Sequence, residues 1–202
     1  MTNENIEEKI IFTARQVFVE KGYEETCMSD IATRVGINRP TLHYYFRTKE
    51  RLFQAIFRDV VNSLFPCIQS IINQDTNFFN KISLALDQYI LLFKGNTDLP
   101  AFVFKEIHRD VDHLIYTARE LEIDNLIGQI KNMIQTEMDA GRIRCVKIEI
   151  IFSIFYGLMI FPFVGKNIIK TILLHNSEEE YNIYLNEWKE YVLAQMKSLL
   201  EP

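Results

Sequence analysis

The chain has 202 residues, of which 48% are hydrophobic and 24% charged, with a formal net charge of −5. So many apolar side chains can bury a sizeable core, which excludes an intrinsically disordered chain. With only 7 glycines and 5 prolines, and little strand-like alternation, the composition predicts an all-α protein.

The first predicted helix runs from Asn5 to about Lys21, and Gly22 supplies its stop. Its apolar positions recur at helical spacing and form one stripe that needs a partner surface. The stripe consists of Ile6, Ile10, Ala14, Val17 and Phe18.

Residues 26–49 predict two short helices joined by a tight turn. Gly36 can take the left-handed conformation that ends a first helix, and Asn38 and Pro40 favour the start of a second. A glycine-containing turn between two short helices is the helix-turn-helix signature. The second helix carries polar and aromatic side chains that have little reason to be buried together, which indicates a DNA-reading surface. These are Arg39, Thr41, His43, Tyr44 and Tyr45.

Charge is distributed unevenly around this segment. Within residues 31–58 the only acidic side chain is Glu50, against six basic ones, Arg34, Arg39, Arg47, Lys49, Arg51 and Arg58. Attraction to phosphates acts over a Debye length of ~8 to 10 Å, so a local basic patch suffices on an acidic protein. The alternative is a solvated helix face that happens to be basic.

A fourth helix is predicted from near Lys49 toward Pro66, and no flexible linker separates it from the preceding helices. It therefore looks like a rigid connection. Further helices are expected at about 78–94, 99–116, 120–140, 147–163 and 178–200. We divide the chain into a DNA-binding domain, 1–48, and a helical ligand-sensing and dimerisation domain, 49–202.

The span Ile150–Gly165 has no charged residue. It is shorter than the ~20 residues of a bilayer-spanning helix and holds Pro162, so we expect no membrane insertion but a buried helix shared between a core and a subunit interface. The last helix carries a wide stripe that also needs a partner. Together these last two helices predict a homodimer. The stripe is Tyr181, Leu185, Trp188, Val192 and Leu199.

The segment GYEETCMSDIATRVGINRPTLHYYFRTKERLF resembles the DNA-binding segment of the TetR/AcrR family of transcriptional regulators. The resemblance covers about the first 55 residues. It rests on matches to the family pattern at Gly22, Tyr23, Thr26, Asp30, Ile31, Ala32, Gly36, Thr41, Leu42, Tyr44, Phe46, Lys49, Glu50 and Leu52.

The resemblance implies roles for particular residues. Phosphate contacts set register, whereas contacts to base edges specify sequence. The first turn of the helix that precedes Gly36, with Thr26 and Ser29, would touch phosphate. Leu42 and Phe46 are expected in the core. The residues that face the base edges would be Arg39, Pro40, Thr41 and His43, and those that grip the DNA backbone would be Tyr44, Tyr45 and Lys49. Asn38 is also counted among the DNA-binding residues.

Three departures from the family pattern bear on the site. Cys27 replaces a threonine and weakens a usual N-cap. Pro40 replaces a glycine and biases Arg39 away from helical geometry, so the cap falls on either Asn38 or Arg39. His43 and Tyr45 invert the usual order of aromatic residue and histidine. The operator sequence therefore cannot be borrowed from relatives.

The resemblance further implies a homodimeric repressor that leaves a palindromic operator when a small apolar or amphipathic effector binds the C-terminal domain. The pocket should be apolar with few polar groups. An aromatic stripe is also often plain core, which remains the alternative for each candidate. The candidate ligand-binding residues are Tyr89, Phe93, Phe102, Phe104, His108, Tyr116, Phe152, Tyr156 and Met159.

No catalytic motif is found, and we predict neither an enzyme nor a cofactor nor a metal site. The cluster of Glu106, His108, Asp110, Asp112 and His113 fits a polar surface or, for His108 and Arg109, a pocket. The two histidines lie five apart, which is not the spacing of a zinc helix. Three widely separated cysteines (Cys27, Cys67, Cys145) and an N-terminus unlike a signal peptide favour a cytoplasmic protein.

Two other functions stay open. The first is a DNA-binding regulator controlled by a partner protein or by no ligand, which the absence of a cavity of ~300 Å³ would favour. The second is a small helical enzyme or carrier whose N-terminal helices only resemble a helix-turn-helix.

Overall fold

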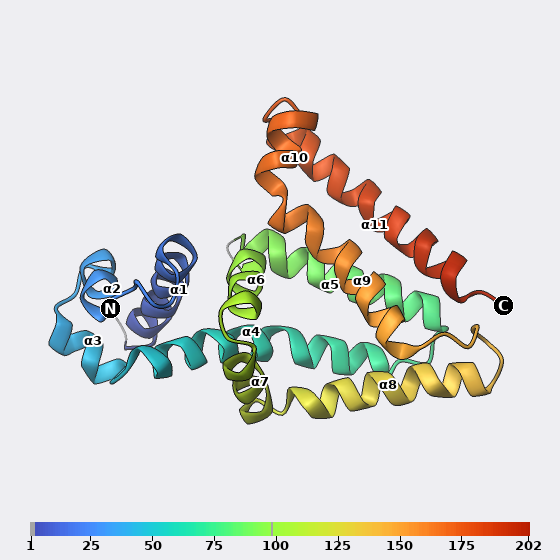
Figure 1. Cartoon of the computed structure of the whole chain (residues 1–202), viewed down its shortest axis with the longest axis horizontal. Helices are drawn as coiled ribbons and strands as arrows, with labels where there is room; N and C mark the ends of the chain where they lie inside the picture. The colour runs from blue at the N-terminus through green and yellow to red at the C-terminus, as the bar shows by residue number, and fades with distance from the viewer. Residues whose placement is uncertain (1–2, 98) are drawn as a thin grey trace. The chain divides into compact units, whose positions relative to one another are not determined.

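The structure, a computed structural model, describes residues 3–97 and 99–202, without the side chains of residues 3–5, 60, 63, 113 and 114. The described ranges fold into helices and hold no strand, so the predicted all-α class is confirmed (Figure 1). In chain order the helices are α1 (Asn3–Lys21), α2 (Met28–Val35), α3 (Arg39–Tyr45), α4 (Lys49–Ile72), α5 (Phe78–Gly95), α6 (Leu99–Arg109), α7 (Val111–Glu120), α8 (Ile123–Asp139), α9 (Ile148–Val164), α10 (Lys166–Leu173) and α11 (Glu178–Leu200).

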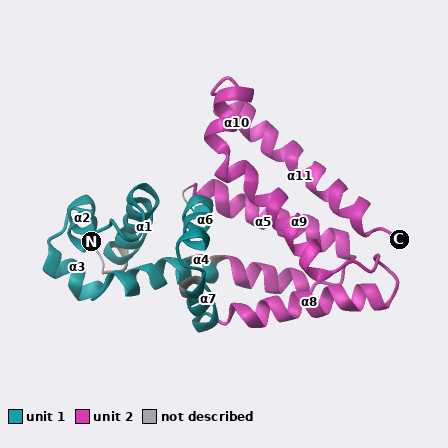
Figure 2. Cartoon of the chain, in the orientation of Figure 1, with its two compact units in different colours: residues 1–63, 98–121 teal, residues 64–97, 122–202 magenta. Residues whose placement is uncertain are grey.

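The chain divides into two compact units (Figure 2). Unit 1 comprises residues 1–63 and 98–121, and unit 2 comprises residues 64–97 and 122–202. The sequence-based boundary lay between residues 48 and 49. The structural division differs from it because α6, α7 and the first part of α4 pack with the N-terminal helices. The assignment of DNA binding and sensing to the two parts remains a proposal.

Unit 1 is built around a cluster of phenylalanines from three helices. Phe18 of α1, Phe53 of α4 and Phe102 of α6 are each at most 2% exposed. The ring centroid of Phe102 lies 5.2 Å from that of Phe53 and 5.3 Å from that of Phe57. Aromatic pairs at these separations add to the burial of their large apolar surfaces. The cluster fixes α6 against the N-terminal helices.

Helix α4 continues past Pro66 to Ile72, beyond the end that the sequence suggested. A proline inside a helix costs about 3 kcal/mol. Ile68 and Ile71 follow it and are buried in a cluster with Leu126 of α8. Burying such side chains is worth about 1.5 to 3 kcal/mol each, which offsets the proline.

Two further boundaries differ from expectation. The helix predicted at 99–116 is two helices, α6 and α7, which meet at Asp110, and no glycine or proline marks the break. Between α9 and α11 lies α10, which the sequence did not suggest. It turns from α9 by 65°. A Cβ at Gly165, where the bend falls, would lie 3.1 Å from the carbonyl oxygen of Phe161.

By length and composition alone, α4 could cross a membrane, as could α9 with α10 if the two formed one span. The bend argues against a single span for that pair. In α4, Leu52, Phe53 and Ile56 are fully buried in the core of unit 1, while Arg51 and Arg58 are exposed. This is the burial pattern of an amphipathic core helix.

In unit 2, α5 and α9 both pack against α11. Pro162 lies inside α9 and has no N–H to donate to the carbonyl of Leu158. The indole Nε1 of Trp188, on α11, donates to that oxygen at 2.9 Å. One turn beyond, the Tyr181 hydroxyl donates to the carbonyl of Pro162 at 3.0 Å. Helix α11 thus supplies donors to α9 where its own ladder is interrupted.

The predicted stripe of α11 is therefore used within the chain. Tyr181, Leu185 and Val192 are at most 3% exposed. The exposed apolar residues of α11 are instead Ile183 and Tyr191. A second copy that contacted α11 would meet this other face.

Candidate DNA-reading helix and effector cavity

The turn between α2 and α3 has the geometry that its sequence indicated. Gly36 takes a left-handed conformation with φ of +83°, and Gly36 N–H donates to the Ala32 carbonyl at 3.1 Å. Asn38 is the N-cap of α3, and its Oδ1 accepts hydrogen bonds from Thr41 N–H at 2.8 Å and Thr41 Oγ1 at 2.7 Å. Pro40 lies in the first turn. Of the two possible caps, Asn38 is therefore the one used.

Helix α3 buries one side and exposes the other. Leu42 and Phe46 are 0% and 6% exposed, so their predicted core role is confirmed. Arg39 and Pro40 are exposed, and Tyr44 is 80% exposed, while Thr41, His43 and Tyr45 are partly buried. The Tyr44 ring packs edge to face against the Tyr45 ring, with 5.3 Å between the ring centroids. A side chain as exposed as Tyr44 is a surface residue and not a packing residue.

The start of α2 is less uniform than the resemblance implied. Ser29 is exposed, but Thr26 is only 1% exposed and its hydroxyl donates to the Gly22 carbonyl at 2.7 Å. The Thr26 side chain thus stabilises the turn and is not presented to a DNA surface. Cys27 occupies the N-cap, and its N–H donates to the Asp30 carboxylate over a long 3.5 Å.

Lys49, expected to grip DNA backbone, is engaged within unit 1. Its Nζ donates to the carbonyls of Tyr23 at 2.7 Å and Glu24 at 3.3 Å, and lies 4.3 Å from the centroid of the Tyr23 ring. An ammonium group above an aromatic face is attracted by the ring quadrupole. Lys49 therefore holds the loop before α2 against the start of α4.

A second cation meets the same loop from α6. The Arg109 guanidinium carbon lies 4.1 Å from the Tyr23 ring centroid, and Arg109 also pairs with Glu24 at 3.2 Å and Glu106 at 2.7 Å. Glu106 is 3% exposed. The cluster expected to be a polar surface thus includes a buried carboxylate paired with Arg109. Burial, with the hydrogen bond to Glu50, raises the pKa of the Tyr23 hydroxyl well above its usual value.

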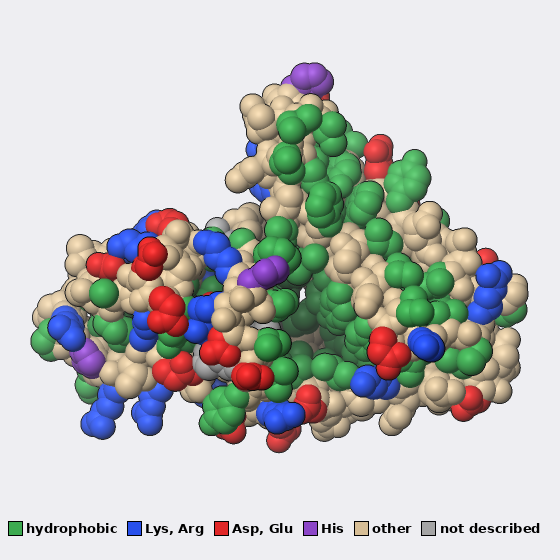
Figure 3. Space-filling model, viewed as in Figure 1, with side chains coloured by type: hydrophobic (Ala, Val, Ile, Leu, Met, Phe, Trp, Pro, Cys, Tyr) green, Lys and Arg blue, Asp and Glu red, His purple; other side chains and the backbone are tan. Residues whose placement is uncertain are grey.

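The basic segment is partly compensated. Arg34 donates two hydrogen bonds to the Glu20 carboxylate, and these bonds lower the pKa of Glu20. Arg39, Arg47, Arg51 and Arg58 are exposed. Figure 3 shows Lys and Arg side chains along the edge that carries α3 and the start of α4. These cations can neutralise phosphates.

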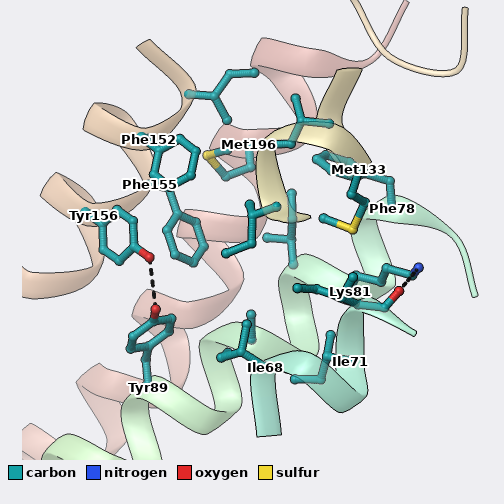
Figure 4. Close-up of a pocket in the computed structure, with 16 residues that line it drawn as sticks. Ile68, Ile71, Phe78, Lys81, Tyr89, Met133, Phe152, Phe155, Tyr156 and Met196 are labelled. Atoms are coloured by element: carbon teal, nitrogen blue, oxygen red, sulfur yellow. Dashed lines mark hydrogen bonds between the residues drawn. The ribbon is translucent and has the colours of Figure 1, made fainter. Parts of the chain in front are cut away.

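Unit 2 holds an apolar cavity (Figure 4). The space within it is about 90 Å³, and about 640 Å³ when the gaps between atoms and the solvent-open mouth are included. At one end the hydroxyls of Tyr89 and Tyr156 lie 2.9 Å apart and share a hydrogen bond. Burial raises the pKa of both hydroxyls, so they stay protonated at neutral pH.

Of the candidate pocket residues, the cavity brings together Tyr89, Phe152 and Tyr156. Met159 is buried in the same unit but is not among the lining residues. The ring centroid of Phe93 lies 4.9 Å from that of Phe163, and Phe93 lines a different, more polar pocket of about 210 Å³.

The other four candidates belong to unit 1. Phe102 is part of the phenylalanine cluster, and Tyr116 is 54% exposed. Phe104 is 43% exposed and its ring lies against that of His108, whose Nδ1 is 2.9 Å from the Phe104 carbonyl. The side chain of His113 lies outside the described residues.

Most of the cavity wall was missed because aliphatic residues carry no chemical signal in a sequence. The only hint was helical spacing in α5, where Phe78, Ile82, Ala85 and Tyr89 share one face. The lining residues that sequence reasoning did not select are Ile68, Ile71, Ile72, Phe78, Lys81, Ile82, Ala85, Ile130, Met133, Ile134, Ile151, Phe155 and Met196.

The geometry of α2 and α3 defines a helix-turn-helix unit with an exposed second helix. Residues 10–56 match the model of the tetR family of bacterial regulatory proteins. The chain is 34% identical, over 65% of its length and 64% of the relative's, to the biofilm operon icaADBC HTH-type negative transcriptional regulator IcaR of Staphylococcus aureus. The segment that holds the helix-turn-helix, residues 10–56, is therefore that of a tetR-family regulator.

Solved structures share the fold over nearly the whole chain. The fatty acid degradation regulator FadR from Bacillus halodurans covers 96% of this chain and 97% of its own, with a TM-score of 0.71 and 15% identity. FadR from Bacillus subtilis in complex with stearoyl-CoA covers 92% and 97%, with a TM-score of 0.68 and 17% identity. By sequence, the chain spans less than two thirds of the length of the curated relatives it matches. Those relatives are named as regulators and not as enzymes.

Proposed function

We propose that the chain is a cytoplasmic, sequence-specific DNA-binding transcriptional regulator that acts as a repressor. The exposed face of α3 carries the proposal, because a capped helix that presents Arg39, Pro40 and Tyr44 to solvent is built to enter a groove. The exposed arginines around it supply attraction to phosphate. The curated relative from Staphylococcus aureus is itself named as a negative regulator.

Within this face the proposed roles differ. Arg39 is the side chain able to bond a guanine through two hydrogen bonds, which is worth ~1 to 3 kcal/mol of discrimination. Thr41 and His43 lie along the same short helix. Tyr44, together with Ser29 of α2, is proposed to contact the DNA backbone. Lys49 acts by holding the loop before α2, which positions that helix on the phosphates.

We further propose a homodimer, because two recognition helices about 34 to 36 Å apart would read a palindromic operator. The exposed apolar residues of α9, α10 and α11 supply the surface. Figure 3 shows hydrophobic side chains gathered over these helices. The residues are Phe161, Val164, Ile168, Ile172, Leu173, Ile183 and Tyr191.

The cavity in unit 2 is the proposed effector site. A neighbour with the same fold was solved with stearoyl-CoA, an amphipathic molecule. An effector releases DNA only through its different affinity for the two conformations of the protein. Helix α4 contributes residues to both units and is the proposed transmitter.

One observation favours the second candidate, a regulator without a small ligand. The cavity volume of about 90 Å³ lies below the ~300 to 1,000 Å³ of most small-molecule sites. A ligand of ordinary size therefore requires the walls to move apart. A screen for compounds that abolish DNA binding separates the two candidates, since the second predicts that none does so.

The DNA-binding proposal is tested by selecting bound sequences from a random duplex pool and repeating the selection with two variants. Arg39→Ala should relax the preference at particular bases by ~1 to 3 kcal/mol and leave stability unchanged, because the side chain is exposed. Lys49→Ala should weaken binding to all duplexes alike and also lower stability. Failure of the wild-type chain to enrich any sequence would overturn the proposal.

A further inference from the structure

The apolar cavity of unit 2 has a single charged residue among the sixteen that line it, and this residue is Lys81 of α5. The others are aliphatic, aromatic or methionine side chains. Bringing an ammonium group to an apolar wall costs free energy unless a partner compensates it. The position of Lys81 therefore calls for a reason beyond filling space.

Part of the compensation comes from the end of α4. Lys81 Nζ donates to the carbonyl of Ile72, the last residue of that helix, at 2.7 Å. A cation is favourable at a helix C-terminus, where carbonyls lack intrahelical partners. This bond uses one of the three N–H donors of the ammonium group, which leaves donors for another acceptor.

The nearby carboxylate of Glu137 does not neutralise Lys81. Its oxygens accept two hydrogen bonds from Arg142, at 2.7 and 2.9 Å, and these bonds are the main reason why the pKa of Glu137 is lowered. Lys81 contributes to that lowering only as the last of its causes. The positive charge at the edge of the cavity therefore remains.

The two polar features of the wall lie apart. Figure 4 shows Lys81 at one edge of the lining residues and the Tyr89–Tyr156 pair at the opposite edge, with apolar side chains between them. The tyrosine hydroxyls share one hydrogen bond with each other and carry no charge. Only the Lys81 end offers a charge to a ligand, so the cavity has a cationic end and an apolar body.

We propose that the cavity binds an amphipathic carboxylate, with its acid group at Lys81 and its hydrocarbon body against Ile71, Phe78 and Phe152. The proposal rests on the effector role given to this cavity above. A charge-assisted hydrogen bond selects the acid over an uncharged molecule of the same shape, and the apolar wall rewards chain length.

The test measures binding to the purified full-length chain by isothermal titration calorimetry, without DNA. Hexanoate and octanoate are compared with the alcohols of the same chain lengths and with methyl octanoate. The wild-type chain should bind octanoate at least about tenfold more tightly than octan-1-ol. Octanoate should also bind more tightly than hexanoate.

Variants assign that preference to Lys81. Lys81→Met keeps the stem and removes the charge, so the preference for the acid should vanish, and Lys81→Arg should retain most of it. Lys131→Met, at an exposed position of α8 outside the cavity wall, should behave as the wild type. A Lys81 that merely caps α4 would change stability but not the ratio between acid and alcohol.

Equal affinity for acid and alcohol in the wild type, or no binding of any acid, overturns the inference even if the Lys81 variants fail to fold. So does a preference that survives Lys81→Met. Because no DNA is present, the result is independent of the proposed regulator. Selective acid binding by a chain that enriches no DNA sequence would remove the regulator and leave the acid site standing.

Discussion

At the scale of single residues, the side chains that shape the DNA-reading unit act mostly by holding backbone. Asn38 caps α3 through two bonds to Thr41, Thr26 fastens the turn after α1, and Lys49 binds two loop carbonyls. Each satisfies backbone or hydroxyl groups that helix ends leave without partners. In the proposed function, the residues that contact DNA are those with no such role in holding the backbone, above all Arg39 and Tyr44.

Asn38 gives a direct test of this division. Replacement by alanine removes both bonds to Thr41 and should lower the free energy of unfolding by about 1 kcal/mol. Asn38→Ser retains a capping oxygen and should lose much less. Urea unfolding followed by circular dichroism measures both variants. Equal losses for alanine and serine would show that the cap is not what Asn38 contributes.

At the scale of helices, α6 is tied to the loop before α2 by Arg109. This arginine faces the Tyr23 ring, pairs with Glu24, and compensates the buried carboxylate of Glu106. Because α6 also shares the phenylalanine cluster, a shift of α6 within unit 1 would pull on the loop that leads into the DNA-reading helices. Apolar packing and an ion pair thus both hold α6 against the N-terminal helices and their loop.

We expect Arg109→Met to lower the free energy of unfolding by about 3 to 5 kcal/mol, because it leaves the Glu106 carboxylate buried without its partner. The double variant Glu106→Met with Arg109→Met should recover most of the loss. Arg142→Met, which breaks the more exposed pair with Glu137, serves as the control and should leave the free energy of unfolding nearly unchanged. Additive losses in the double variant would contradict the coupling.

How much the sequence could predict depended on the kind of signal. The α2–α3 turn was predictable because glycine, asparagine and proline act locally on backbone geometry. The end of α4 was not, because burial of Ile68 and Ile71 against α8 overrides Pro66. The wall of the cavity depends on contacts between distant helices, and the burial of Glu106 is not visible in its spacing from Arg109. The stripe of α11 was visible, but its partner proved to be inside the chain.

At the scale of the whole molecule, the proposed regulator needs two copies held together. The exposed apolar residues of α10, Ile168, Ile172 and Leu173, are 58 to 69% exposed, more than a single soluble domain needs to leave in water. Contiguous apolar surface of this kind marks interaction sites. A second copy is the partner that the proposed palindromic operator would require.

Ile172→Lys should therefore shift the chain from dimer to monomer in sedimentation velocity. It should also weaken operator binding, because the two recognition helices are no longer held together. Val111→Asp, at an apolar residue of α7 that is 50% exposed, is the matched control and should leave the association state unchanged. A dimer that withstands Ile172→Lys would place the interface elsewhere.

The backbone hydrogen bond that α9 lacks at Pro162 has a consequence for how the sequence can vary among homologues. Pro162 strands the carbonyl of Leu158, and Trp188, 26 positions later in the chain, supplies the missing donor. Each residue is needed because of the other. A residue with an N–H at position 162 could bond the Leu158 carbonyl itself and would remove the need for the indole at 188. Loss of the indole would leave that carbonyl without a donor as long as Pro162 is present. Among homologues, we expect the two positions to be inherited as a pair and to change together.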